Sequence, residues 1–102
     1  MSNQNHNQVS PAYAATLNVL SKKDGEIKTK SVLNKRLSNA GYSKDDRAAA
    51  LAELLDDGLV LDVSNKVPMS GNKATLYVIT DDGKDILSKI SSGKIGIIST
   101  LD

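Results

Sequence analysis

The sequence predicts a mostly helical α+β domain that carries a small β-ribbon. Two observations lead to this prediction. First, residues 76–87 read as a strand that runs directly into a capped helix. Second, the apolar run at residues 59–63 follows a helical segment, and a loop of small, polar and basic residues joins it to the later strand. The two apolar runs are therefore the expected arms of the ribbon.

Residues 11–21 are predicted to form the first helix. Pro11 suits the first turn of a helix, where its missing N–H costs nothing. The apolar residues of this segment recur at helical spacing: Tyr13, Leu17 and Leu20. A turn at residues 22–25 then leads into residues 26–29, which are short enough to be a single edge strand.

Two more helices are expected next, with a short break at residues 39–42. Thr29 can cap the second helix, whose apolar residues are Val32, Leu33 and Leu37. Ser43 followed by Asp46 forms an Asp-containing version of a capping box, so the third helix begins there. Gly58 is expected to end that helix as the residue after its C-cap.

The third helix has two predicted faces, obtained by placing its residues at about 100° intervals. The face expected to enter the core carries Ala48, Leu51, Leu54 and Leu55. The opposite face carries Asp46, Ala49, Ala50 and Glu53. We therefore expect the two alanines at positions 49 and 50 to lie on the surface.

The chain divides into one domain with a segment on each side. Residues 1–10 contain five Asn or Gln and are expected to be a disordered tail, and residues 11–90 form the domain. Thr80 caps a fourth helix that returns three apolar residues to the core: Ile86, Leu87 and Ile90. Residues 91–102 form an apolar tail with Ile95, Ile97, Ile98 and Leu101. This tail either supports a homodimer or packs on its own subunit.

Composition excludes several functional classes. A chain of 102 residues forms one domain, and the absence of cysteine removes disulfides, thiol catalysis and thiolate metal sites. The single histidine, His6, lies in the tail, so we expect neither an enzyme nor a cofactor or metal site. The start of the chain does not resemble a signal peptide, and no apolar run approaches the ~20 residues that cross a bilayer. A cytoplasmic protein without a membrane partner is expected.

The charge is unevenly distributed although the net charge is only +1. Residues 22–47 carry eight basic and four acidic groups, whereas residues 48–62 carry four acids and no base. The ribbon loop adds two lysines. Positive charge therefore gathers on the segment from the first turn to the start of the third helix and on the loop, as expected for a protein that meets an anionic partner.

The predicted order of elements is helix, strand, helix, helix, strand, loop, strand, helix, which is typical of a winged helix-turn-helix. That architecture usually binds DNA. Three motifs support it further: Gly41-Tyr42-Ser43 at the corner, Leu-Leu-Asp-Asp-Gly-Leu-Val at residues 54–60, and Tyr-Val-Ile-Thr-Asp-Asp-Gly at residues 77–83. Together they resemble winged-helix transcription regulators of the MarR and PadR type, over roughly residues 11–90. The wing departs from both patterns because it contains no arginine, and the long terminal helices by which MarR proteins dimerise are missing.

The resemblance implies that residues 43–57 are a recognition helix in the major groove of double-stranded DNA and that residues 64–74 form a wing on the backbone. Ser43, Lys44 and Arg47 lie in the first turns, where Arg47 could contact guanine O6 and N7 at a typical ~1–3 kcal/mol of discrimination. Ala49 and Ala50 could touch a thymine methyl. The expected phosphate contacts are Lys28, Lys30, Lys35, Arg36, Lys66 and Lys73.

Several alternatives stay open at this point. Asp45 and Asp46 would face phosphates at the start of the recognition helix; either could accept from cytosine N4, but we favour helix capping as their role. An ion pair with Asp46 or another nearby acid is the alternative for Arg47. Tyr42 is expected to lock the second helix onto the third. For the whole chain, the alternative function is a winged-helix protein–protein interaction module that does not bind DNA.

Overall fold

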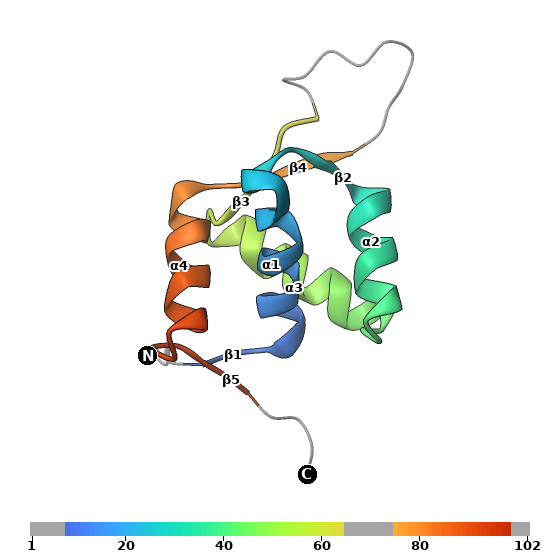
Figure 1. Cartoon of the computed structure of the whole chain (residues 1–102). Coiled ribbons are helices and arrows are strands. Elements are labelled where there is room, and N and C mark those ends of the chain that lie inside the picture. Colours follow the sequence, from blue (N-terminus) through green and yellow to red (C-terminus); the bar gives the residue numbers. More distant parts are fainter. Residues whose placement is uncertain (1–7, 65–74, 99–102) are drawn as a thin grey trace.

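The computed structural model of the protein describes residues 8–64 and 75–98. Within these residues the fold is α+β, with four helices and a three-stranded antiparallel sheet (Figure 1). The helices are α1 (Pro11–Gly25), α2 (Lys30–Asn39), α3 (Lys44–Asp56) and α4 (Asp81–Ser91). The sheet contains β2 (Lys28–Thr29), β3 (Val60–Asp62) and β4 (Leu76–Ile79). A second sheet pairs β1 (Gln8–Val9) in parallel with β5 (Gly96–Ile97).

The three-stranded sheet confirms both arms of the predicted ribbon. Its strand order is β2-β4-β3, and β3 pairs with β4 in an antiparallel register that sets Val60 opposite Ile79 and Asp62 opposite Tyr77. Strand β2 pairs with the other side of β4, so it is an edge strand, as predicted. Residues 65–74, which contain most of the predicted wing, lie outside the described residues.

Helix α1 is the centre of the molecule. It packs against α2, α3, α4 and β4, and Figure 1 shows it between α2 and α4 with the three-stranded sheet across one end. The largest fully buried side chains are almost all aliphatic: Leu17, Leu20, Leu33, Leu37, Leu54, Val60 and Thr16. The Thr16 hydroxyl donates to the Ala12 carbonyl oxygen at 2.7 Å, so its burial leaves no unpaired donor. Aliphatic burial around α1 therefore provides most of the stabilisation of this fold.

Each helix begins with a side-chain cap. The hydroxyls of Ser10, Thr29, Ser43 and Thr80 accept a hydrogen bond from the backbone N–H three residues later, at 3.0–3.2 Å. This satisfies one of the N–H groups that a helix start leaves without a partner. The predicted caps at Thr29, Ser43 and Thr80 are confirmed. Gly58 follows α3 with φ +76°, as expected for a residue that ends a helix in the left-handed conformation.

The predicted faces of α3 were wrong at two alanines. Ala48 is exposed, whereas Ala50 is only 1% exposed and belongs to the core with Leu51 and Leu54. Alanine is compatible with a buried or an exposed position on a helix. The leucines therefore did not determine the rotation of α3 about its axis closely enough to decide which alanine is buried. Of the three apolar residues predicted on α2, Leu33 and Leu37 are buried, whereas the side chain of Val32 is 41% exposed.

The chain ends also differ from the expectation. Residues 8–10 were assigned to a disordered tail, yet Gln8–Val9 form a strand and Ser10 caps α1. At the other end Ile95 is buried, and the Ile98 N–H donates to the Val9 carbonyl oxygen at 2.8 Å. This part of the tail packs on its own subunit, while Ile97 and Ile98 stay exposed. Self-association through residues 91–102 stays a prediction.

One hydrogen bond between side chains joins α1 to the end of α3. The Tyr13 hydroxyl donates to Asp57 Oδ2 at 3.0 Å. Burial raises the pKa of Tyr13 well above its ordinary value of 10.0, and the hydrogen bond to Asp57 and the charges of Asp57 and Glu53 raise it further. The folded protein therefore holds this proton at a pH where the unfolded chain has lost it.

This pKa shift predicts a loss of stability at alkaline pH. The contribution is complete below pH 10, the ordinary pKa, and it declines as the pH rises above that value, because the unfolded chain then releases a proton that the folded chain keeps. In urea titrations between pH 7 and 11, the free energy of unfolding should fall above pH 10. Tyr13→Phe should lower the free energy of unfolding by about 0.5–1.5 kcal/mol at pH 7, because it removes the hydrogen bond. Above pH 10 the free energy of unfolding of this variant should fall less steeply with pH than that of the wild type. If the free energy of unfolding depended on pH in the same way for both proteins, Tyr13 would not be the group responsible.

Candidate nucleic-acid interface

A tight corner fixes α2 relative to α3. After α2, Gly41 takes φ +97°, a conformation that favours glycine, and the Tyr42 N–H donates to the Leu37 carbonyl oxygen at 3.1 Å. The Tyr42 side chain is half-buried and packs against the core. This arrangement agrees with the prediction that Tyr42 locks the second helix onto the third.

A groove between α2 and α3 gathers basic side chains. Its volume is about 390 Å³. The polar residues that line it are Lys30, Asn34, Lys44 and Arg47, and the apolar ones are Ala48, Leu51, Ala52 and Leu55. No carboxylate is among these residues, so the positive charges are not neutralised within the groove. We call this the cationic groove.

The two lysines of the cationic groove stand at the beginnings of helices, whereas its α3 wall continues as far as Leu55. Lys30 is the first residue of α2 and Lys44 is the first residue of α3. Both lysines are exposed. Because a helix N-terminus carries a partial positive charge, the backbone reinforces the two ammonium groups there. Sequence reasoning missed Asn34, although it lies one helical turn after Lys30 and this spacing places both residues on one face of α2.

Arg47 takes neither of the roles considered for it. Its Nη1 donates to the Tyr42 carbonyl oxygen at 2.8 Å, which ties the guanidinium to the corner. Its Nε is buried and has no hydrogen-bond partner among the described residues. With Nη1 engaged in this way, a bidentate contact to guanine would require the side chain to move. The described residues give Arg47 no ion pair with an acid. Across residues 8–64 and 75–98 the one ion pair is Lys89–Asp85, at 3.3 Å on α4.

Lys28 was predicted to contact phosphate, but the structure gives it a different role. Its ammonium donates to the carbonyl oxygens of Leu20, Lys22 and Glu26 at 2.7–3.2 Å. These bonds use all three of its donors and close the end of α1, where the backbone leaves the helical conformation at Lys22. Burial lowers the pKa of Lys28 despite the opposing charge of Glu26. Lys28 is therefore a structural residue.

The remaining predicted contacts divide into three groups. The predicted contact between Ala50 and a thymine methyl is wrong, because the Ala50 side chain is buried in the core. Ser43, Lys35, Arg36 and Ala49 are exposed but do not line the cationic groove, and the Ser43 hydroxyl already caps α3. Lys66 and Lys73 lie outside the described residues. Among the described residues, the predicted contacts that line one groove are therefore Lys30, Lys44 and Arg47.

The exposed side of α3 also carries acids. Asp45 and Asp46 lie in its first turn and Asp56 in its last, and all three are exposed. The Asp46 N–H bonds to Ser43, and acids at this end of a helix are favourable for the helix dipole, which supports the capping account. Carboxylates on this surface would nevertheless repel DNA phosphates.

Comparison of the chain with models of protein families, with curated proteins and with solved structures finds no match. In the described part of the chain, no helix combines the length and apolar character needed to cross a membrane. The same residues contain no group of three or more His, Cys, Asp or Glu placed to hold a metal ion.

Proposed function

We propose that this chain is a winged helix-turn-helix protein that binds double-stranded DNA, and that it acts as a transcription regulator. The observation that carries the proposal is the cationic groove, in which the first residues of α2 and α3 present lysines and no carboxylate intervenes. The order of elements, with β3 and β4 paired after α3, supports a winged helix. The MarR and PadR resemblance belongs to the same proposal.

In this proposal Lys30 and Lys44 hold phosphates on the two sides of a major groove, and α3 enters the groove between them. The small side chains of Ala48 and Ala52 allow the helix to approach the base edges closely. Arg47 supports the corner from behind and contributes its charge without reading a base. Lys66 and Lys73 stay predicted wing contacts.

The salt dependence of binding tests this assignment. In mobility-shift titrations with random duplex, Lys30→Ala and Lys44→Ala should each flatten the slope of log K against log salt by ~0.9. The matched controls are Lys94→Ala, an exposed lysine beyond α4, and Lys28→Ala, whose ammonium is already used inside the protein. Both controls should keep the wild-type slope. Equal slopes for all five proteins would refute the proposed interface.

A protein–protein interaction module without DNA binding is the second candidate. The exposed carboxylates Asp45 and Asp56 on α3 favour it, because they oppose the approach of a duplex. A mobility shift with random duplex at ~50 mM salt separates the two functions, since a DNA-binding protein shows at least weak nonspecific affinity under that condition. Complete indifference to duplex would favour the protein partner.

A further inference from the structure

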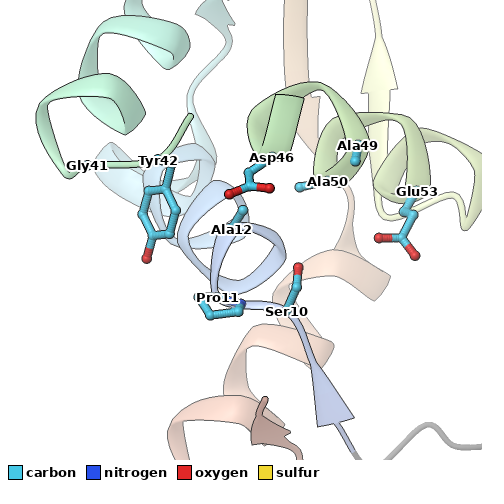
Figure 2. A pocket seen from close by; sticks show the side chains of 9 residues that line it. All are labelled: Ser10, Pro11, Ala12, Gly41, Tyr42, Asp46, Ala49, Ala50 and Glu53. Carbon is cyan, nitrogen blue, oxygen red and sulfur yellow. The ribbon is translucent and has the colours of Figure 1, made fainter. Parts of the chain in front are cut away.

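A second groove lies on the other flank of α3, next to the start of α1. Figure 2 shows Asp46 and Glu53 extending from α3 beside Ser10 and Pro11, with the Tyr42 ring at one side. Its volume is about 410 Å³, and the remaining lining residues are Ala12, Gly41, Ala49 and Ala50. Neither lysine nor arginine lines it, so this groove is the electrostatic opposite of the cationic groove.

The groove continues toward α4 and the paired chain ends. Ser10 and Glu53 also line a neighbouring hollow of about 710 Å³. Apolar side chains make up much of its wall: Val9, Leu59, Ile86, Ile95 and Ile98. Ile98 is 41% exposed there. Asp57 is the second carboxylate of this hollow, and again no lysine or arginine lines it. We call the two hollows together the acidic groove.

The acids of this groove form a regular row. Asp46, Glu53 and Asp57 are separated by seven and then four residues, a spacing that places them on one stripe of a helix. At 1.5 Å of rise per residue the row is about 16 Å long. The one ion pair of the described residues is elsewhere, on α4, so no lysine or arginine in the described structure neutralises these carboxylates.

We propose that the acidic groove binds a basic amphipathic segment of another protein. Lysine or arginine side chains of that segment would face the row of carboxylates, and its apolar side chains would cover the isoleucines and Tyr42. Residues 1–7 and 99–102 do not supply such a segment, because they contain neither lysine nor arginine. This inference is independent of DNA binding, since it uses the flank of α3 away from the cationic groove.

Fluorescence anisotropy with a labelled 14-residue helical peptide of lysine and leucine tests the proposal on the full chain. The peptide should bind, and binding should weaken as salt rises. Glu53→Lys should lower the affinity about five- to tenfold, because it replaces an attraction by a repulsion. Asp56→Lys is the matched control: it makes the same charge change at an exposed position of the same helix outside the groove, and should change the affinity less than about twofold.

Two control peptides separate charge from apolar contact. Replacing the lysines by glutamate should abolish binding, and replacing the leucines by serine should weaken it at least as much as Glu53→Lys does. Equal losses for Glu53→Lys and Asp56→Lys would mean nonspecific attraction to an acidic helix and would overturn the proposal. It would also be overturned if sedimentation showed that the protein alone is a dimer which Glu53→Lys dissociates, since a second copy would then occupy the groove.

Discussion

Replacing Ala50 by glutamate should abolish cooperative folding or lower the free energy of unfolding by at least about 3 kcal/mol. The Ala50 side chain is 1% exposed and belongs to the core cluster, so the larger glutamate would either disrupt the core or be forced into the acidic groove that Ala50 lines. In that groove the carboxylates of Asp46 and Glu53 would repel it, and no lysine or arginine is there to pair with it. A loss of this size is a large fraction of the stability of a small domain. Urea denaturation followed by circular dichroism measures it.

The adjacent residue provides the control. Ala49 is exposed on the same helix, so Ala49→Glu makes the same chemical change one residue away. Repulsion by Asp45 and Glu53, each four residues away, should limit the loss in the free energy of unfolding to about 1 kcal/mol. Similar losses for the two variants would show that α3 is rotated from the position described above. The pair therefore also tests the correction that removed Ala50 from the predicted DNA contacts.

Gly83→Ala is the second change with a large expected effect. Gly83 is buried in the first turn of α4, and a Cβ at this position would collide with the Leu59 carbonyl oxygen and lie 2.7 Å from Cγ1 of Ile79. That carbonyl cannot easily move, because it accepts hydrogen bonds from the Thr80 N–H at 3.0 Å and from the Thr80 hydroxyl at 3.1 Å.

The size of the effect follows from two opposing contributions. Alanine is favoured over glycine in a helix by about 1 kcal/mol, whereas forcing atoms into a packed site costs typically 1–3 kcal/mol and more against backbone. We expect a net loss of about 2 kcal/mol in thermal or urea denaturation. Ser88→Ala, at an exposed position of the same helix, should be neutral or slightly stabilising. A stabilised Gly83→Ala variant would contradict the close approach of the Leu59 carbonyl to α4.

The features that sequence reasoning predicted well are those fixed by local chemistry. Thr29, Ser43 and Thr80 are hydroxyl residues placed directly before apolar helical patterns, and a cap needs only its own first turn. The antiparallel ribbon was also predictable, because its two strands are apolar runs of similar length that are close in sequence.

The errors concern features fixed by distant contacts. Whether Ala48 or Ala50 faces the core depends on how α3 lies against α1, and alanine carries little information about that orientation. Lys28 and Arg47 looked like free cations because the sequence does not show which backbone carbonyls will lie within their reach. The sequence therefore identified the basic residues of the candidate site. It could not show which of them already form hydrogen bonds inside the protein and which are available to a partner.

The pairing of β1 with β5 has a consequence for how this domain opens. It joins residues at the two extremes of the described chain, so the pair closes a loop that contains almost the entire fold. Closing so long a loop costs conformational entropy, and this cost is small only after the helices have packed. Few buried groups then stabilise the pair. Gln8, Gly96 and Ile97 of the pair are exposed, so we expect its amide hydrogens to exchange with solvent faster than those of α1. Local opening of this kind would change the apolar wall around Ile95 and Ile98 without global unfolding.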